Sequence, residues 1–483
     1  MTTATQESIE LRTTSNAGTA TVAVSHPQSA TRSARWPIVA ASVLVFTGFL
    51  YSLVWGPLVQ HGSHWVVPGD IWATFRAAHY VGWGDIGDVY GPLTGLVTFP
   101  LIAVVLAPVA LLSGHLGLSE SLPFFLPHPS AWLLLGPVEL AIGASTLFPL
   151  DALGERIGIT RPRRILLLGI ETALLWPVVA IWGHPEDALA MTFGLWGLMA
   201  ALDGRWTRCG WMWGLAIAAQ PLVVLMLPVV FGMSPLRRWP GIALRTAAPA
   251  LALLAVPLVQ SWADTSRALF QQPNYPSVDH PTPWAALAPV LSSAHRIVST
   301  QFSQVHTPHG VRFTTSLVTG TAGRVIAAGP GRLIALLLSI GMGVWVNRRR
   351  PVGLEVMWLC GLALSLRCVF ESVMNPYYLW PPLALLVLVV ACSSWWRFAM
   401  TGAAAFAVTV YSYHRTGPWA WYLPVMVLLA TAVMASWPSQ SRRMSGHHSG
   451  RPSSDALPGM SRALPRRILS TAGTSTSGSS LPT

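Results

Sequence analysis

Lysine is absent from the 483-residue chain, so all 30 basic residues are arginines. Charged residues of both signs make up only 10% of the chain, and 18 of them are acidic. A soluble protein of this length needs far more charge on its surface, whereas 52% of this chain is hydrophobic. Apolar runs of roughly 20 residues, each long enough to cross about 30 Å of hydrocarbon, recur along the sequence. The composition therefore predicts a polytopic helical membrane protein.

Cysteine is also scarce, and the four cysteines are scattered without the spacing of a disulfide framework or of a metal site. The net charge of +12 comes from arginines in short loops between apolar runs, which is the pattern of membrane topology and not of nucleic acid binding. The first apolar run begins near Pro37, too late for a cleaved signal peptide, and is expected to be a retained anchor. These features exclude a disulfide-rich secreted domain and argue against a nucleic acid partner.

The chain divides into two polar tails and one apolar domain. Residues 1–36 and 438–483 are rich in Ser, Thr and Gly and are expected to be disordered cytoplasmic tails, the second one basic. Residues 37–437 are expected to form one all-α transmembrane bundle. Its apolar segments are 37–58, 93–113, 131–150, 165–183, 188–202, 211–231, 240–261, 326–346, 352–370, 377–396, 398–413 and 418–437.

Arginine-rich loops constrain how these segments cross the membrane. The positive-inside rule places four such loops in the cytoplasm, namely 155–164, 203–208, 234–238 and 347–350. If every apolar segment crosses the membrane, these four loops cannot all lie in the cytoplasm. Prolines interrupt the segments 93–113 and 211–231, and if these two do not cross fully, all four loops lie inside. We therefore predict about ten full crossings plus two Pro-broken or re-entrant segments. The protein is then a multi-pass plasma membrane protein with both termini in the cytoplasm.

Four regions face outward in this topology: 59–92, 183–187, 262–325 and 371–378. The long loop 262–325 contains the proline-rich stretch 270–284, which predicts an ordered but non-helical cover. The first loop holds Asp70, Asp85 and Asp88, three of the few acids in the chain. Asp70 precedes an expected short helix and either caps it or acts chemically. Asp85 and Asp88 lie among turn formers and are expected to make turns, since a metal site there lacks a suitably spaced His.

Other candidate binding residues lie in or beside the outward regions. Arginine matches an anionic group in a bidentate fork, acids and His at a membrane surface suit a ligand or a divalent metal, and aromatic rings stack on sugars. The candidates are Arg76, His79, His184, Glu186, Asp187, Gln220, Arg312, Asn375, Tyr377 and Tyr378. For each an ordinary alternative stays open: helix capping, lipid contact, bonding to backbone freed by a helix break, or an interfacial aromatic belt. Arg367 and Glu371 are expected to form an i,i+4 ion pair.

The order of these features resembles the GT-C superfamily of integral membrane glycosyltransferases, in particular the polyprenyl-phosphate-mannose-dependent mannosyltransferases of actinobacteria. The resemblance is carried by an outer-loop Asp followed by YGPL (90–93) before a Pro-broken run, by GHPEDALA (183–190), by the segment 203–231 and by NPYYLWPPL (375–383). Two positions differ from the family pattern: Gln220 stands where members often have Lys, and Ile71 follows Asp70 in place of a second carboxylate.

The resemblance implies transfer of a sugar, mannose in the nearest group, from a polyprenyl-phosphate donor to a lipid-linked or cell-envelope glycan acceptor on the outer face. Asp70 matches the family's first-loop general base, and outward arginines are expected to stabilise the leaving phosphate. No cofactor is certain, although a divalent metal would fit the turn at 183–187. Two alternatives remain: a transporter or flippase for a lipid-linked or anionic substrate, and a non-catalytic membrane protein.

Overall fold

The computed structural model describes residues 35–55, 58, 64–91, 94–120, 126, 128–272, 274, 280–291, 295–307, 310–321, 325–351, 353–414 and 417–438. Within the two strands that span 295–321 it describes the backbone only. Almost all of both expected tails therefore lies outside the described residues. Most of residues 56–63 and Arg324 of the expected outer loop 262–325 also lie outside them.

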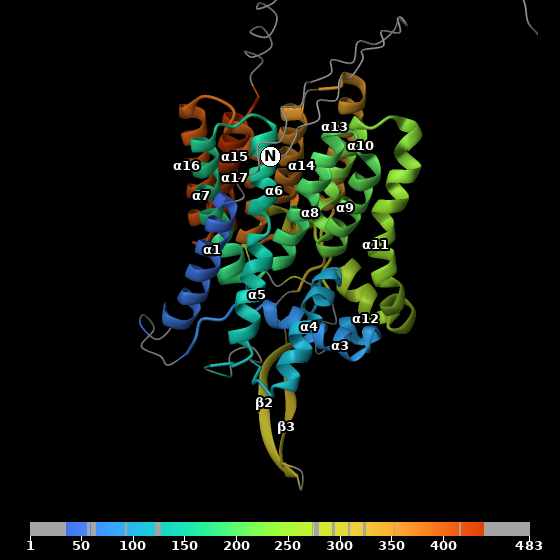
Figure 1. Cartoon of the computed structure of the whole chain (residues 1–483). Helices are drawn as coiled ribbons and strands as arrows, with labels where there is room; N and C mark the ends of the chain where they lie inside the picture. Colours follow the sequence, from blue (N-terminus) through green and yellow to red (C-terminus); the bar gives the residue numbers. More distant parts are fainter. Residues whose placement is uncertain are drawn as a thin grey trace, which may run out of the picture. The chain divides into compact units, whose positions relative to one another are not determined.

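The described chain is built almost entirely of helices (Figure 1). The α-helices are α1 (Arg35–Leu50), α3 (Ile71–Trp83), α4 (Leu101–His115), α5 (Trp132–Ala144), α6 (Leu147–Arg156), α7 (Arg161–Pro177), α8 (Pro185–Leu202), α9 (Trp206–Ala219), α10 (Leu227–Met233), α11 (Trp239–Gln260), α12 (Trp262–Ser266), α13 (Gly331–Arg349), α14 (Gly353–Phe370), α15 (Trp380–Val390), α16 (Trp395–Ser412) and α17 (Pro418–Ala435). The prediction of a helical bundle is confirmed.

Six helices among the described residues are long and apolar enough to cross a membrane, which indicates a multi-pass membrane protein. They span Arg35–Trp55, Trp132–Arg156, Arg161–Trp182, Leu236–Gln260, Gly353–Phe370 and Pro418–Ala435. Three shorter apolar helices lie at Leu101–His115, Pro221–Met233 and Pro376–Val390. The ten crossings expected from hydropathy exceed the six long helices, so the additional crossings and their sidedness stay predictions.

Both segments expected to be broken are interrupted, but not at every proline. Helix α9 ends at Ala219, and a tight 3₁₀ turn (η4, Pro221–Met226) separates it from α10, because Pro221 lacks the N–H that would continue the helix. In the first segment, residues 94–100 are non-helical, whereas Pro108 lies inside the continuous helix α4. The helical turns on either side of Pro108 therefore accommodate this proline, which was expected to interrupt the segment.

Non-helical structure gathers in the expected outer loop 262–325. Strands β2 (His295–Thr307) and β3 (Gly310–Thr321) pair antiparallel, and β1 (His280–Pro281) pairs with β4 (Val373–Met374) from the loop after α14. The first residues of this loop are helical, in α12 and in a π-turn (η6, Arg267–Gln271). The prediction of a non-helical cover concerned residues 270–284. Residues 270–271 lie in η6, residues 283–284 begin a 3₁₀ turn (η7, Pro283–Leu287), and β1 is extended, so the prediction is confirmed for only part of the stretch. Residues 273 and 275–279 lie outside the described residues.

The four basic loops meet at one end of the bundle. Arg156 bonds to Asp203, which joins the first loop to the second, and Arg350 donates to the carbonyls of Gly232 and Met233, which joins the fourth to the third. Residues of the second and third loops also line one cavity. Helices α3 and α4 and the β2–β3 hairpin lie at the opposite end (Figure 1). This clustering agrees with one common side for all four loops.

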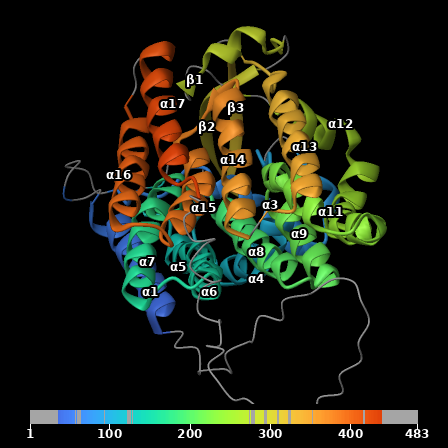
Figure 2. The same cartoon turned by 90° about the horizontal axis from the view of Figure 1, so that it is seen from above.

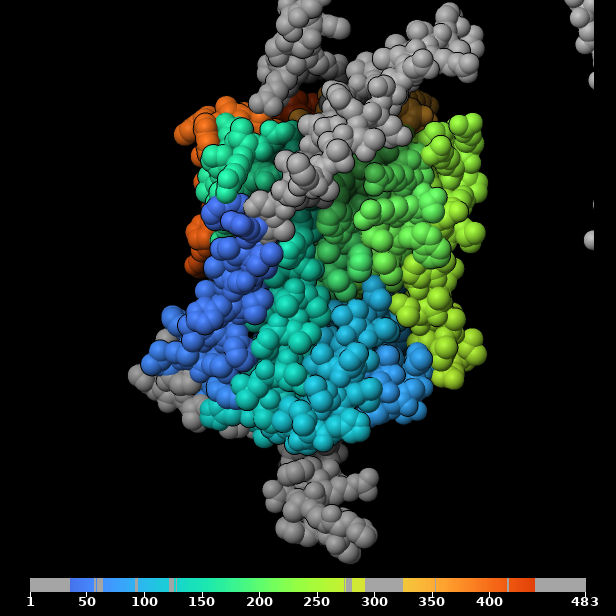
Figure 3. Space-filling model, viewed as in Figure 1, coloured from blue at the N-terminus to red at the C-terminus, as the bar shows by residue number. Residues whose placement is uncertain are grey.

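The helices differ in how many of their residues are buried, and this difference separates the centre of the bundle from its periphery. Every residue of α15 is buried, and most residues of α8 are buried as well, so these two helices form the centre of the bundle (Figure 2). Helices α1 and α11 occupy opposite margins of the face in Figure 3, in blue and yellow-green, and expose large apolar side chains. Apolar side chains on the outside are stable only against hydrocarbon, which again fits a membrane protein.

Candidate functional site

Asp70 precedes α3 but does not cap it. Its backbone is already helical, and its side chain makes no capping hydrogen bond. The carboxylate instead lies 3.0 Å from Nε2 of His184, a residue 114 positions later in the chain. The Asp70 side chain is 58% exposed, whereas its partner is largely buried. The alternative of a simple N-cap is therefore wrong, and Asp70 is a solvent-accessible acid held by a tertiary contact.

His184 connects the exposed acid to buried ones. The turn at Gly183, which has a positive φ, brings the imidazole to the start of α8, where Nδ1 lies 2.6 Å from Oε1 of Glu186. Burial disfavours the charged imidazole, but the charge of Glu186 and the hydrogen bonds to Glu186 and Asp70 outweigh it, so the pKa of His184 lies well above its usual value. The protonated ring thus links two carboxylates.

Glu186 and Asp187 are buried in the first turn of α8, whose N-cap residue His184 makes no capping hydrogen bond. One oxygen of each, Oε2 of Glu186 and Oδ2 of Asp187, has no hydrogen-bond partner among the described residues. Glu139 of α5 is fully buried and close enough for electrostatic interaction with Glu186 and His184. Capping explains none of these positions, since a capping acid stays at the solvated end of a helix.

Three aromatic and amide side chains cover the cluster from the turn between α14 and α15. The ring of Tyr377 stacks on His184 with 3.8 Å between centroids and 22° between planes. Asn375 donates to the hydroxyl of Tyr377, and its own Oδ1 has no partner among the described residues. Tyr378 packs edge-on against Tyr377. The predicted residues Asn375, Tyr377 and Tyr378 therefore join Asp70, His184, Glu186 and Asp187 in one site.

Two arginines and one glutamate extend the site. The predicted ion pair of Arg367 and Glu371 is confirmed, with 3.5 Å between Nε and Oε2. The same glutamate, only 1% exposed, also accepts from Nε of Arg332 at 2.9 and 3.0 Å. The guanidinium of Arg367 lies 3.4 Å above the ring of Tyr378, and its Nη2 has no hydrogen-bond partner among the described residues. Two cations thus share Glu371, Arg367 also interacts electrostatically with Asp187, and the unpartnered Nη2 of Arg367 is a donor available to an anionic ligand.

An apolar groove of about 380 Å³ ends at these arginines. Apolar side chains line most of it, among them leucines of η4, α11, η6 and α13, and Gln272, Arg332 and Arg367 supply the polar end. Phe270 and Leu333 on its wall are 70% and 59% exposed, so the groove opens at the outer surface of the helices. A long hydrocarbon chain with an anionic head matches this lining.

A small void of about 10 Å³ lies beside the groove and borders one of the acids. Asp187, Gln220, Arg367 and Tyr378 are among its lining residues, and it shares Leu222 and Arg367 with the groove. Gln220 lies at the break between α9 and η4, with an extended backbone and a buried side chain. The helix break therefore places a polar side chain at the junction of groove and cluster, as expected for a broken apolar segment.

A divalent metal has three potential ligands here. Ligand atoms of His184, Glu186 and Asp187 lie within 4.8 Å of one another. Both ring nitrogens of His184 already contact carboxylates, so a metal on His184 must displace Asp70 or Glu186. The two unpartnered oxygens of Glu186 and Asp187 are the better donors for a cation, and they equally suit a substrate hydroxyl.

Some predicted residues lie elsewhere. His79 contacts Glu120 at 2.5 Å and packs between Phe75 and Trp83, and Arg76 donates to the carbonyl of Thr94. Burial lowers the pKa of Arg76, and the charge of Glu120 partly offsets this effect. The structure therefore does not bring Arg76 or His79 to the cluster. Arg312 lies on β3, where the side chains are outside the described part of the structure.

The other acids of the first loop differ from Asp70. Asp85 and Asp88 are exposed and accept turn hydrogen bonds through their backbone carbonyls, and neither side chain contacts another described residue. Their predicted role as turn residues fits this geometry, although the turns use the backbone and not the carboxylates.

Sequence reasoning did not select Arg332, Gln272 or Glu139 as site residues, and assigned Arg367 only to an ion pair. Glu139 could have been selected from the sequence, because it lies inside an apolar segment, where a charged residue is costly and usually functional. Arg332 and Gln272 carry no such signal, because both lie next to loops where polar residues are ordinary.

Known families and curated proteins offer no further assignment: no family model matches the chain, and no curated protein matches it.

Proposed function

We propose that this protein is a membrane glycosyltransferase that uses a polyprenyl-phosphate sugar donor and Asp70 as general base. The observation that carries the proposal is the apolar groove that ends at Arg332 and Arg367, because Arg367 also lines the small void that borders Asp187 of the acid cluster. The groove suits the prenyl chain, and the arginines suit the phosphate. The motifs that resemble GT-C enzymes contain most residues of the cluster, namely His184, Glu186, Asp187, Asn375, Tyr377 and Tyr378.

The reaction follows from these positions. An acceptor hydroxyl attacks the anomeric carbon of the donor sugar while the bond from that carbon to the phosphate oxygen breaks, and configuration inverts. Asp70 takes the hydroxyl proton, which its exposed position permits. The polyprenyl phosphate leaves with the electron pair, and Arg332 and Arg367 stabilise the added negative charge. His184 orients Asp70, and the ring of Tyr377 or Tyr378 offers a stacking surface for sugar.

A sugar-transfer assay tests the proposal. Membranes that contain the full chain are incubated with radiolabelled polyprenyl-phosphate mannose and with endogenous lipid or glycan acceptors. We expect label in a new glycosidic bond, and we expect Asp70→Asn to remove it. Asp85→Asn is the matched control, because Asp85 is an exposed acid of the same loop without a side-chain partner among the described residues.

The same assay separates the alternatives. Label that crosses the membrane without a new bond favours a transporter or flippase of the donor. Label that neither moves nor reacts under conditions where the protein is folded favours a non-catalytic membrane protein. Full transfer by the Asp70→Asn variant would rule out the proposed base. Chelation with EDTA shows whether a divalent metal takes part.

A further inference from the structure

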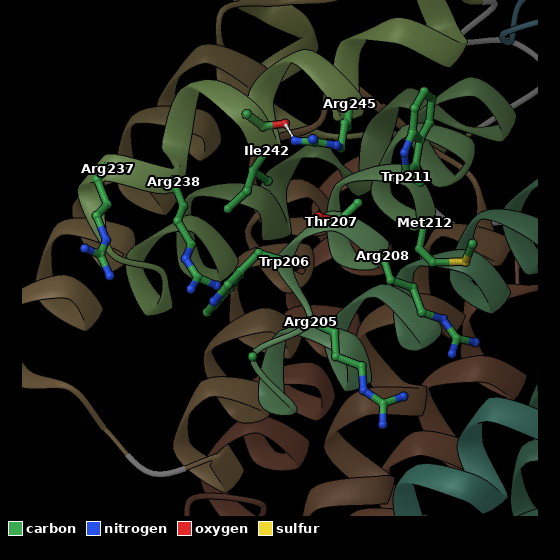
Figure 4. A pocket seen from close by; sticks show the side chains of 12 residues that line it. Arg205, Trp206, Thr207, Arg208, Trp211, Met212, Arg237, Arg238, Ile242 and Arg245 are labelled. Carbon is green, nitrogen blue, oxygen red and sulfur yellow. Dashed lines mark hydrogen bonds between the residues drawn. The ribbon is translucent and has the colours of Figure 1, made fainter. Parts of the chain in front are cut away.

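A large cavity lies at the basic end of the bundle, not at the acid cluster. It has a volume of about 760 Å³ and lies between the start of α9 and the start of α11 (Figure 4). Five arginines and two tryptophans line it, namely Arg205, Arg208, Arg237, Arg238, Arg245, Trp206 and Trp211. No acidic residue is among its lining residues.

The arginines of this cavity lack partners of opposite charge within the described part of the chain. Arg245 donates to the carbonyl of Gly241, and Arg208 lies 6.0 Å from the ring centre of Trp196. Arg205, Arg237 and Arg238 make no side-chain hydrogen bond or ion pair there. The nearest acid in sequence, Asp203, is already bound to Arg156. Five like charges around one space repel one another unless an anion enters.

Two helix N-termini add to the positive field. Both α9 and α11 begin with an arginine at the N-cap position, Arg205 and Arg238, and neither has a side-chain cap. The first amides of α9 have no partner within the helix. At α11 the amide of Trp239 already donates to the carbonyl of Leu236 and Pro240 has no N–H, so this helix contributes mainly the positive end of its dipole. An acid is the usual residue at a helix N-terminus, and an arginine there is unfavourable. An anion in the cavity would satisfy the amides of α9 and the guanidinium groups together.

An exposed apolar flank next to the cavity indicates the class of anion. Leu244 and Leu251 on α11 are 71% and 61% exposed, and Leu244 is adjacent in sequence to the lining residue Arg245. Trp211 is exposed on α9 and belongs to the cavity wall. Tryptophan is enriched where headgroups meet hydrocarbon. A soluble anion can bind to the arginines only, whereas a lipid can also place its acyl chains against this apolar flank.

We propose that this arginine cavity binds the phosphate headgroup of an anionic phospholipid, whose acyl chains lie along the exposed flank of α11. The site is independent of the proposed sugar transfer, since it lies at the other end of the bundle. Its volume accommodates a headgroup with more than one phosphate, such as that of diphosphatidylglycerol, and basic pockets between membrane helices bind such headgroups.

Lipid binding to the purified full chain tests the proposal. The protein in detergent micelles is titrated with diphosphatidylglycerol, phosphatidylglycerol or phosphatidylcholine, and the bound fraction is measured by native mass spectrometry. We expect tight binding of diphosphatidylglycerol, weaker binding of phosphatidylglycerol and little binding of phosphatidylcholine. The double substitution Arg237→Gln and Arg238→Gln should weaken the binding of diphosphatidylglycerol roughly tenfold or more.

The control is a second pair of exposed arginines in another basic loop. Arg348→Gln with Arg349→Gln removes the same charge outside the cavity, and we expect less than a twofold change. Equal losses in both double variants would mean that only the overall charge of this end matters, and would overturn the site. Arg238→Gln alone serves if the double variant does not fold, with a smaller loss expected.

A soluble probe separates a lipid from a free anion. Leu244→Gln should weaken the binding of diphosphatidylglycerol but leave competition by inorganic pyrophosphate unchanged. Pyrophosphate that binds as tightly as the lipid, together with no effect of Leu244→Gln, would show that the cavity takes a free phosphate compound and would overturn the lipid assignment.

Discussion

The two ends of the bundle differ in how their charged side chains are arranged. At the end that holds Asp70, acids and bases from five parts of the chain lie together. Most of them are buried, although Asp70 is largely exposed, and most contact a group of opposite charge. At the end that holds Arg237 and Arg238, charges of one sign are exposed around a cavity. Buried charges must be compensated within the protein, because desolvation is costly, whereas exposed ones are compensated by water or by a ligand. The first arrangement suits chemistry, and the second suits binding of an anion from outside.

The difference predicts where substitutions matter most, and the largest effect is expected at Asp70. Asp70→Asn should lower the rate of sugar transfer by roughly 10²–10⁴, the usual contribution of a general base. The free energy of unfolding should change little, since the side chain is largely exposed. Initial rates at saturating donor, compared with the Asp85→Asn control, measure the effect. A rate within twofold of wild type would exclude Asp70 as base.

Glu371 is expected to show the largest effect on stability. Glu371→Gln removes the carboxylate that Arg332 and Arg367 share and leaves two cations unpaired, which should cost about 3–5 kcal/mol. The matched control is Asp264→Asn, which breaks the exposed pair with Arg267 and should cost less than about 1 kcal/mol. Unfolding by SDS, followed by circular dichroism, measures both variants. Similar losses would contradict the contrast between buried and exposed pairs.

The apolar groove should determine the length of donor chain that the enzyme accepts. Leu336→Trp places a larger side chain on the groove wall and should weaken use of a long-chain donor about tenfold. A short-chain donor should be nearly unaffected, because its tail does not fill the groove. The ratio of kcat/KM for the two donors is the measurement. An equal loss of kcat/KM for both donors would mean that the substitution disturbs the catalytic site and not the binding of the donor's hydrocarbon chain.

His184 should make stability depend on pH. Its folded pKa lies above the value of about 6.5 in the unfolded chain, so its interactions stabilise fully below that pH and are lost as pH rises through the folded pKa. Asp70, Glu186, Asp187 and Glu139 are the acids that face the ring. As pH rises above about 6.5, wild type should therefore lose more stability than His184→Phe, which keeps a ring against Tyr377.

The measurement for His184 is unfolding by SDS in buffer with a chelator, at a series of pH values. His115→Phe is the control, because His115 is exposed and should leave the pH profile unchanged. Identical profiles for wild type and His184→Phe would contradict the link to the two carboxylates.

The smallest effect is expected at the basic end. Arg237→Gln with Arg238→Gln should change the free energy of unfolding by less than about 0.5 kcal/mol in neutral detergent, because neither side chain has a partner to lose among the described residues. The same unfolding assay, without anionic lipid, measures it. A large loss of stability would show that these arginines are structural and would remove the contrast between the two ends.

Part of the site could be predicted from the sequence because it depends on short spacings. The acids of the turn 183–187 and the aromatic pair at 377–378 stand out as polar groups next to apolar runs, and the pair of Arg367 and Glu371 follows from helical spacing. The sequence made Arg76 and His79 candidates because they follow Asp70 in the same outer loop, although their spacing does not stack them above it, and their side chains contact Thr94 and Glu120 instead. Proximity along a helix does not determine which face a side chain uses.

By itself the sequence determined that this is a helical membrane protein, where its apolar segments lie, and that a helix break falls at Gln220, because hydrocarbon length and the missing N–H of proline act locally. Only the tertiary structure decided which of three similar acids meets a histidine, that Arg332 and Arg367 share Glu371, and that two basic loops enclose one cavity. These contacts join residues from 39 to 114 positions apart, as for Arg332 with Glu371 and Asp70 with His184. Such pairings depend on how helices pack, and helix packing is a property of the whole bundle and not of any one segment.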